Sequence, residues 1–238
     1  MSAPLADLMR PQTIDEVVGQ SHILNKDGIL YRIAQSGRAA NLIFYGPSGT
    51  GKTTVARIIA KQAGKKLYKL NGTTASTADI KEIISSLDTF EGMNGVVLYL
   101  DEIQYLNKKQ QQTLLEFLEN GQITLIASTT ENPYFYVYNA IISRSTVFEF
   151  KAVSPEEIEK ALQRGVSILQ KQAQEEGLTL EVEDHVLRSI ALSCGGDVRK
   201  SINTLEIAYL SALVQDSKKM ITAQQLQGVS QRAALRYD

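Results

Sequence analysis

A glycine-rich loop in the first quarter of the sequence has the residue types of a phosphate-binding site. It consists of Gly46, Pro47, Ser48, Gly49, Thr50, Gly51, Lys52 and Thr53, followed by Thr54, and it matches the pattern GxxxxGK[ST]. Glycines allow backbone N–H groups to approach phosphate oxygens, and the N-terminus of a following helix favours negative charge. The pattern predicts that Lys52 contacts the β- and γ-phosphates of a nucleotide and that Thr53 binds Mg²⁺.

An acidic pair follows a strongly apolar run further along the chain. Residues 95–100 read Gly-Val-Val-Leu-Tyr-Leu, and Asp101 and Glu102 come directly after them. A carboxylate at the end of a strand is suited to bind Mg²⁺, directly or through water, which is the role predicted for Asp101. Glu102 stands one residue further on, where a carboxylate is suited to polarise an attacking water.

Three other polar positions are candidates for contacts with a nucleotide. A polar segment, residues 128–132 (Ser-Thr-Thr-Glu-Asn), follows an apolar run where a polar side chain is suited to orient water, with an ordinary polar loop as the competing interpretation. Arg144 precedes another apolar run and is a candidate arginine finger, which supplies charge to a transition state, or else a solvated surface arginine. Arg199 falls in the first turn of a helix that Asp197 is suited to cap. The helix dipole disfavours a cation there, which points to a distant anionic partner for Arg199, with an ordinary surface arginine as the competing interpretation.

Apolar runs and helical patterns alternate through the first 150 residues. Continuous apolar runs predict buried strands at 41–45, 66–70, 95–100, 122–127 and 146–150, and helices are expected at 53–63, 78–87 and 108–119. Continuous rather than alternating apolarity is typical of strands covered on both faces. We therefore predict an α/β fold with a parallel five-stranded sheet flanked by helices. The strand at 66–70 falls between the loop strand and the Asp101 strand in the sequence, and in P-loop proteins this spacing accompanies the branch with a catalytic glutamate.

The pattern changes after Phe150. Ser154 and Pro155 mark a helix start, and helices are predicted at about 155–174, 183–194, 197–214 and 222–228, with no strand among them. We place a domain boundary near Ala152. This gives an α/β domain at 1–152, on which the irregular residues 1–20 are expected to pack, and a small all-α lid domain at 153–238.

Composition excludes several classes of protein. The 238 residues include 25 Lys and Arg against 26 Asp and Glu, which rules out a generally basic nucleic-acid coat. One cysteine, Cys194, excludes an internal disulfide and a cysteine-built metal site. The N-terminus does not resemble a signal peptide, and no apolar run approaches the roughly 18 residues of a membrane span. We expect a soluble protein from a reducing compartment.

Taken in order along the chain, these motifs resemble those of AAA+ ATPases of the clamp-loader clade. The segment 8–20 is similar to the adenine-binding segment of that clade. More narrowly, residues 128–133 (Ser-Thr-Thr-Glu-Asn-Pro) and 196–206 (Gly-Asp-Val-Arg-Lys-Ser-Ile-Asn-Thr-Leu-Glu) resemble the replication-associated recombination protein A family, also called RarA or MgsA. The eukaryotic counterpart of that family is the Werner-helicase-interacting protein.

The resemblance implies a role for each motif residue. Lys52 and Thr53 match Walker A, Asp101 and Glu102 match Walker B, and Thr130 matches the first sensor, with Thr129 a fallback for register. Arg144 matches an arginine finger acting on ATP held by a neighbouring subunit, although relatives have Cys or Ala where this chain has Ser145. Arg199 matches the second sensor, which reaches from the lid to the γ-phosphate. Val17, Val18 and Gly19 are expected to border the adenine.

The family also implies a function. It implies Mg²⁺-dependent ATP hydrolysis coupled to maintenance and recombination of replication forks, in the bacterial cytoplasm and associated with the nucleoid. The expected partners are single-stranded, gapped or end-containing DNA, single-strand-binding protein, replisome components and further copies of the chain. Residues 232–238 resemble the point where family members continue into a tetramerisation region, so we expect a truncated chain and a tetramer in the full-length protein.

Other functions remain open at this stage. A clamp-loader subunit is one alternative, but the zinc-binding cysteines of bacterial small subunits are absent after the loop. A Holliday-junction branch-migration motor is another, and the winged-helix region expected after the lid of such a motor is not in this chain, although truncation would hide it. An ATP-binding switch or scaffold with little hydrolysis belongs to a different class, and the intact Glu102, Arg144 and Arg199 argue against it. The two arginines also argue against a small-molecule kinase.

Overall fold

The computed structural model describes residues 3–87 and 95–226. The chain forms two compact units: residues 11–151 make one, and residues 1–10 together with 152–238 make the other. We refer to them as the α/β unit and the helical unit, and each is described by itself.

The α/β unit contains a five-stranded parallel sheet, as the sequence predicts. Its strands run in the spatial order β2-β3-β4-β1-β5. Their bounds are β1 Leu42–Tyr45, β2 Lys66–Asn71, β3 Val96–Asp101, β4 Ile123–Thr129 and β5 Thr146–Glu149. Tyr45 pairs with Thr129, and Asn71 pairs with Asp101. The carboxyl ends of the strands therefore meet along one edge of the sheet, where the loop and the acidic pair begin.

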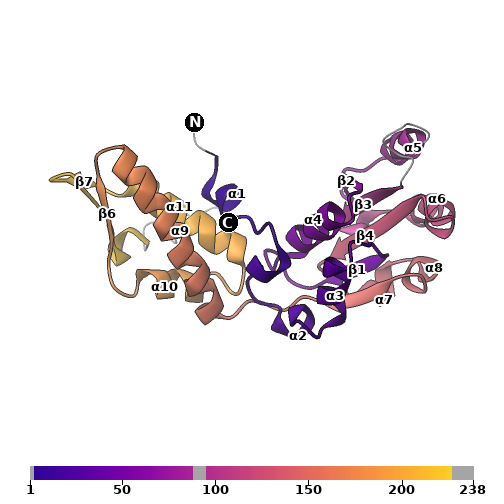
Figure 1. Ribbon diagram of the computed structural model, residues 1–238, viewed down its shortest axis with the longest axis horizontal. Coiled ribbons are helices and arrows are strands. Elements are labelled where there is room, and N and C mark those ends of the chain that lie inside the picture. Colours follow the sequence, from indigo (N-terminus) through magenta and orange to yellow (C-terminus); the bar gives the residue numbers. More distant parts are fainter. Residues whose placement is uncertain (1–2, 88–94, 227–238) are drawn as a thin grey trace, which may run out of the picture. The chain divides into compact units, whose positions relative to one another are not determined.

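Helices cover both faces of this sheet (Figure 1). The two helices α3 (Ile29–Gln35) and α4 (Lys52–Gln62) pack on one face. The other face is covered by α5 (Thr77–Ser86), α6 (Lys108–Glu119) and α8 (Asn139–Ile142). The shorter elements are η1 Ile14–Glu16, α2 Ser21–Leu24, η2 Ile103–Tyr105 and α7 Pro133–Tyr136.

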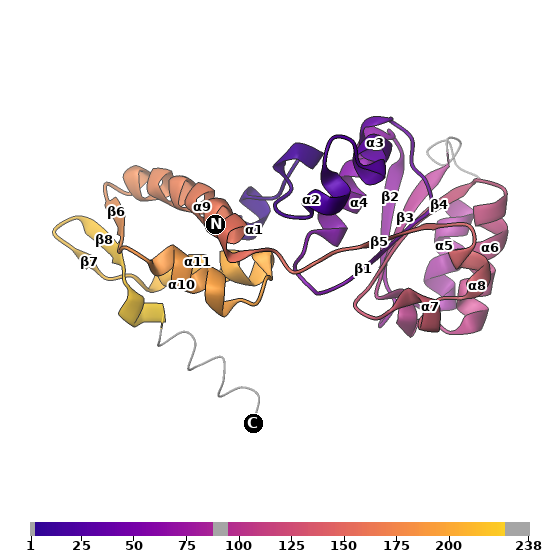
Figure 2. The same cartoon turned by 90° about the horizontal axis from the view of Figure 1, so that it is seen from below.

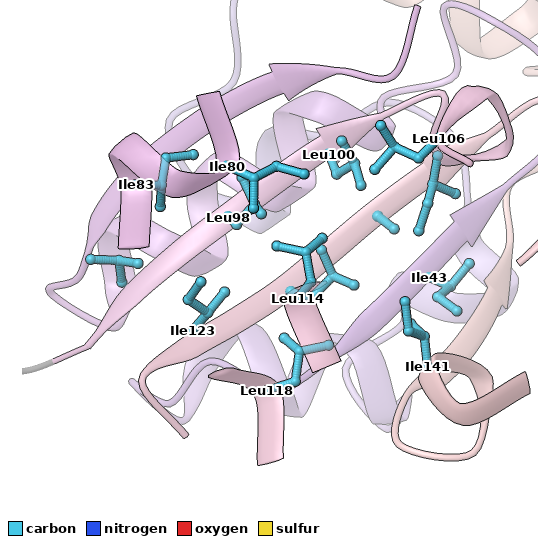
Figure 3. Close-up of a cluster of buried hydrophobic side chains, with 14 of the residues drawn as sticks. Ile43, Ile80, Ile83, Leu98, Leu100, Leu106, Leu114, Leu118, Ile123 and Ile141 are labelled. Carbon is cyan, nitrogen blue, oxygen red and sulfur yellow. The ribbon is translucent and has the colours of Figure 1, made fainter. Parts of the chain in front are cut away.

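Two apolar cores explain why the strands are apolar at consecutive positions. Ile43 points into the core that Figure 3 shows, together with Leu98 and Leu114. Its neighbour Phe44 points the other way, where its ring packs on those of Phe148 and Phe150 at centroid distances of 6.4 and 5.0 Å. Successive side chains of a strand point to opposite faces, so a strand covered on both sides is apolar throughout.

The helical unit is built on three longer helices: α9 (Pro155–Glu175), α10 (Val186–Ser193) and α11 (Val198–Ser211). Ser154 caps α9 by accepting a hydrogen bond from the N–H of Glu157, as its position before Pro155 predicts. The short helix α1 (Leu5–Leu8) also belongs here, and the N–H of Leu5 donates to Glu206 Oε1 at 2.8 Å. Residues 1–10 thus differ from the expectation, which packed them on the α/β domain. The reason is a contact between residues 201 positions apart, of which local sequence carries no sign.

A small sheet in the helical unit corrects the expectation of an all-α domain. It consists of β6 (Thr179–Val182), β7 (Val214–Gln215) and β8 (Lys218–Ile221), in the order β6-β8-β7 (Figure 2). Asp216 and Ser217 have φ of +50° and +59°, so they form a tight hairpin turn between β7 and β8. The helix predicted at 197–214 therefore ends at Ser211.

Some expectations concern residues at the edge of the described chain. A helix is predicted at 222–228, and the structure shows residues 223–226 as helical. Residues 227 and 228 lie outside the described residues. The stretch 232–238 lies outside them as well. Among the helices that the structure describes, none combines the length and apolarity needed to cross a membrane.

Candidate active site

The glycine-rich loop joins β1 to α4 and holds its lysine inside. Lys52 is the first residue of α4 and is buried, and its Nζ donates to the carbonyl oxygens of Gly46 and Pro47 at 2.7 Å each. Thr50 Oγ1 donates to the same Pro47 oxygen at 2.8 Å. Gly51 precedes α4 and has no side chain with which to cap it, so an anion is a natural acceptor for the first N–H groups of the helix. The binding of phosphate by this loop stays a prediction, which its position between β1 and the N-terminus of α4 supports.

The segment before α2 lies against this loop. Gln20 is buried, and its Nε2 donates to Lys151 O at 2.7 Å and to Thr50 O at 3.4 Å. The N–H of Lys151 donates back to Gln20 Oε1 at 2.9 Å. Val17 approaches the loop as well, since a Cβ added to Gly51 would lie 3.6 Å from Val17 Cγ1. Val17, Val18 and Gly19 are half-buried beside the loop, and their contact with adenine stays a prediction.

A chain of hydroxyl groups links the start of α4 to the end of β3. Thr53 Oγ1 lies 2.9 Å from the hydroxyl of Tyr99, which in turn donates to Asp101 Oδ1 at 3.2 Å. Ser128 Oγ lies 2.8 Å from the same hydroxyl and donates to Asp101 Oδ1 as well. Burial, and then the negative charge of Asp101, raise the pKa of Tyr99 well above its ordinary value. Tyr99 therefore keeps its proton across the physiological range and remains a donor.

Glu102 contacts both its own strand end and the next one. Its backbone is left-handed, with φ of +53°. Its Oε2 accepts hydrogen bonds from the N–H and from Oγ1 of Thr130, at 3.3 Å each, and from Gln104 Nε2 at 2.7 Å. Thr129 is buried, and its Oγ1 accepts from the N–H of Glu131 at 2.9 Å. The geometry favours Thr130 over Thr129 as the sensor, although its role stays a prediction.

The predicted ligands of a divalent cation come from two adjoining elements. Thr53 Oγ1 and the Asp101 carboxylate both offer oxygen atoms that can bind a metal ion, and the Tyr99 hydroxyl is hydrogen-bonded to each of them. Mg²⁺ prefers oxygen ligands and is commonly bound by one or two side chains, with waters and substrate phosphates completing the shell. The donor set therefore fits the predicted ion, with Thr53 and Asp101 as the residues to hold it.

Arg144 follows α8 and is bonded within its own unit. Its guanidinium donates to the Glu119 carboxylate at 2.5 Å, to Ala140 O at 2.9 Å and to Ser143 Oγ at 3.3 Å. The side chains of Arg144 and Glu119 are both more than a third exposed. Exposed ion pairs contribute little to stability, so this one is easily exchanged for another anion. The arginine is positioned at the surface, as a residue that acts on another subunit must be.

Arg199 belongs to the helical unit. It lies exposed in the first turn of α11, which Asp197 caps by accepting a hydrogen bond from the N–H of Lys200 at 2.8 Å. The loop before this turn is tied to the start of the unit, because the N–H of Val153 donates to Gly196 O at 3.1 Å. The predicted contact of Arg199 with a phosphate concerns both units and stays a prediction.

Four residues of the site were not among the predicted ones: Gln20, Tyr99, Gln104 and Ser128. Tyr99 has a sequence signal, because it stands two residues before Asp101 and strand periodicity places both on one face of the sheet. Ser128 is likewise a hydroxyl in an apolar strand. The role of Gln20 depends on a partner 131 residues away, and that of Gln104 on a local turn after Glu102.

Gly46 provides a test of the loop geometry. Its φ is +133°, and a Cβ added to it would lie 1.9 Å from the carbonyl oxygen of Phe150. We expect Gly46→Ala to lower the free energy of unfolding by about 2–4 kcal/mol, because backbone strain and overpacking each cost about 1–3 kcal/mol. Denaturant unfolding without nucleotide measures the loss.

Gly121→Ala is the matched control for this change. Gly121 also has a positive φ, +74°, but no atom lies within 4 Å of its added Cβ. This variant should lose about 1–2 kcal/mol, the cost of the left-handed backbone alone. Equal losses at the two positions would show that the close approach of Phe150 is not what requires glycine at 46.

Comparisons with known proteins agree with this architecture. Residues 42–164 match the ATPase family associated with various cellular activities (AAA), and residues 174–238 match the AAA C-terminal domain. A relative from Bacillus subtilis, "Replication-associated recombination protein A", is 39% identical over 87% of this chain and 48% of its own length. The protein of the same name from Coxiella burnetii is 36% identical over 92% of this chain and 49% of its own. The chain thus spans about half the length of these relatives.

A solved structure shows the same fold. It is titled as the RuvB Holliday junction branch migration motor of Thermotoga maritima, and it superposes with a TM-score of 0.73 at 25% identity. The superposition covers 92% of this chain and 71% of the other. The two-part organisation of an α/β sheet followed by a helical region is therefore shared with a known motor protein.

Proposed function

The chain belongs to the ATPase family associated with various cellular activities, and from this premise we propose that it hydrolyses ATP with Mg²⁺ in replication-associated recombination. We further propose that it works as an oligomer on single-stranded, gapped or end-containing DNA, in the bacterial cytoplasm near the nucleoid. Single-strand-binding protein and replisome components are its proposed partners.

One observation carries the proposal of hydrolysis rather than mere binding. The Glu102 carboxylate contacts Thr130 at the same sheet edge where Tyr99 joins Thr53 to Asp101. Ion-binding oxygens and a separate carboxylate thus lie at neighbouring strand ends, directly after a phosphate-binding loop. A protein that only binds nucleotide has no need for the second carboxylate.

Each candidate residue of the chain has a separate role in the proposed hydrolysis. Lys52 and the N-terminus of α4 bind the phosphates, and Thr53 and Asp101 hold Mg²⁺, which neutralises developing charge when bound. Glu102 accepts a proton from the attacking water, and Thr130 fixes the position of that carboxylate. Arg144 of one subunit completes the site of its neighbour.

Steady-state ATP hydrolysis tests the proposal, measured over a range of chain concentrations with and without single-stranded and gapped DNA. We expect the specific activity to rise with chain concentration, because Arg144 is supplied by a neighbour, and to rise further with DNA. Turnover that stays near zero at every concentration while ATP still binds would support a switch or scaffold instead.

The alternative of a branch-migration motor is favoured by the fold shared with the RuvB motor. The DNA substrate that stimulates hydrolysis distinguishes this alternative from the proposed function. A motor of that kind hydrolyses ATP faster with a four-way junction than with a gapped duplex and moves the junction. The proposed function predicts stimulation by gaps and ends without junction movement.

Arg199 offers a further prediction. We expect Arg199→Ala to lower kcat/KM for ATP about 10- to 100-fold, because a hydrogen bond to a charged group contributes about 1.5–3 kcal/mol. Lys200→Ala is the matched control, since Lys200 carries the same charge in the same exposed turn. Similar losses in the two variants would mean that charge near this turn matters, and that Arg199 has no specific phosphate contact.

A further inference from the structure

The surface of the α/β unit displays a group of aromatic side chains. In the described part of the chain, every large aromatic side chain that is exposed comes from η2 or α7: Tyr105, Tyr134, Phe135 and Tyr136. Phe135 is 80% exposed and Tyr105 63%. Burying a large apolar side chain yields about 1.5–3 kcal/mol, so leaving several uncovered on one surface is costly. Such patches mark places where a partner binds. We call these four residues the aromatic patch.

Buried Gln111 holds the two segments of the aromatic patch together. Its Nε2 donates to Leu106 O at 3.0 Å and to Tyr136 O at 3.4 Å, and its Oε1 accepts from the N–H of Tyr138 at 2.8 Å. The backbone after Tyr105 and the end of α7 are therefore bonded to the same side chain. Helix α8 contacts both α6 and α7, and it lies between them in the views of Figures 1 and 2.

The fold presents these rings outward for a local reason. Pro133 and Val137 are buried on either side of the three aromatic residues of α7. Asn132 caps the turn by accepting a hydrogen bond from the N–H of Tyr134 at 3.1 Å. With both ends fixed, one helical turn cannot bury the three side chains between them.

Two exposed lysines follow the η2 segment of the aromatic patch in the sequence. Lys108 and Lys109 are exposed at the start of α6, and Lys108 Nζ lies 5.3 Å from the ring centre of Tyr138. The first turn of α6 contains no acidic residue, and its helix dipole adds positive potential. The carboxylates closest in sequence to α7 and η2 are Glu131 and Glu102, and the Glu102 carboxylate is bonded to Thr130 and Gln104 rather than to either lysine.

This combination points to one class of partner. We propose that the aromatic patch binds single-stranded nucleic acid, its rings stacking on bases while Lys108 and Lys109 contact phosphates. Unpaired bases expose their faces and a duplex does not, and lysine is depleted at protein interfaces, so the chemistry favours a single strand over a duplex or a protein. The inference deepens the proposed function and rests on it, because it assigns the DNA contact to a surface.

The aromatic patch also adjoins the candidate active site. Glu102 immediately precedes η2, and Thr130 stands three residues before α7. These two residues contact each other through the Glu102 carboxylate, which Gln104 of η2 also holds. A strand bound on the aromatic patch would contact both segments that position Glu102, so we expect it to alter the rate of hydrolysis.

The test measures binding of labelled oligothymidylate, oligouridylate and a DNA duplex to the full chain at one fixed salt concentration. We expect single strands to bind more tightly than the duplex, and the first two arms show whether DNA or RNA is preferred. Phe135→Ala with Tyr105→Ala should weaken single-strand binding about 5- to 100-fold, the range expected from losing stacking on a base. Phe135→Trp, which keeps a ring, should retain binding.

Controls separate this inference from loss of fold and from failure of the proposed function. Leu210→Ala removes an equally exposed apolar side chain from the helical unit and should bind as the unaltered chain does. The midpoint of thermal unfolding should be unchanged in all these variants. Lys108→Ala and Lys109→Ala should each reduce the slope of log affinity against log salt concentration by about 1, because each removes one phosphate contact.

Three outcomes would overturn the inference. If the unaltered chain binds single strands and the aromatic variants bind equally well, the aromatic patch is not the contact, although the proposed function stands. If the variants change the sedimentation of the chain but not its affinity for the strand, the patch is an interface between copies. If the unaltered chain binds no nucleic acid and DNA does not affect hydrolysis, the proposed function fails too.

Discussion

Glu102→Gln should stop steady-state ATP hydrolysis while the protein still binds ATP. Glutamine keeps the shape of the side chain but cannot accept a proton, so the attacking water is no longer activated. Proton transfer by a positioned side chain contributes about 10²- to 10⁴-fold, and we expect kcat to fall by a factor in that range. The dissociation constant of a fluorescent ATP analogue, measured on the same sample, should change little.

Glu131→Gln is the matched control. Glu131 follows β4 much as Glu102 follows β3, but its side chain is exposed and its N–H is bonded to Thr129. This variant should retain nearly the full kcat. If Glu102→Gln keeps more than about a tenth of the unaltered kcat, its loss is smaller than the smallest loss expected from general-base catalysis. In that case Glu102 does not activate the water.

Arg144→Ala is the second change with a large expected effect. An arginine finger is worth about 10³–10⁵ in kcat because it stabilises charge in the transition state. We therefore expect hydrolysis by the variant to be at least about 10³-fold slower at saturating ATP. The rate should no longer depend on chain concentration, since neighbours supply no catalytic group.

Mixing the two inactive variants tests whether Arg144 acts between subunits. A Glu102→Gln subunit retains its arginine, and an Arg144→Ala subunit retains its carboxylate. A mixed oligomer joins an intact Arg144 to an intact Glu102 site, so activity should return on mixing. If it does not return, Arg144 acts within its own chain or serves only to maintain the fold.

The contact between Arg144 and Glu119 adds a control to this experiment. In the structure the guanidinium is bonded to Glu119 of its own chain. Glu119→Gln removes this competing carboxylate and should leave kcat unchanged or higher. Arg188→Ala is a matched surface change, because Arg188 is also paired with carboxylates, those of exposed Glu156 and half-buried Glu159. It should not affect hydrolysis.

The sequence by itself was sufficient where the physical cause is local. The pattern from Gly46 to Thr53 requires a strand before it and a helix after it, and β1 and α4 stand there. Continuous apolarity requires burial on both faces, and the order of the elements then leads to a parallel sheet. The strand end after Leu100 likewise places Asp101 and Glu102 at the carboxyl edge.

Tertiary structure decided what depends on contacts between distant residues. The β6–β8 pairing joins segments about 40 positions apart, and each is too short and too polar to signal a strand alone. Residues 3–10 belong to the helical unit, where the N–H of Leu5 donates to Glu206 near the other end of the chain.

The same reason separates the predicted site residues from those that support them. Lys52, Thr53, Asp101 and Glu102 are recognisable because their chemistry demands a fixed residue type at a fixed spacing. Gln20 and Gln111 are ordinary glutamines in the sequence. Each acquires its role only when folding brings its amide to backbone groups of segments that are distant along the chain. A hydrogen bond of that kind leaves no periodicity or spacing in the sequence from which it could be predicted.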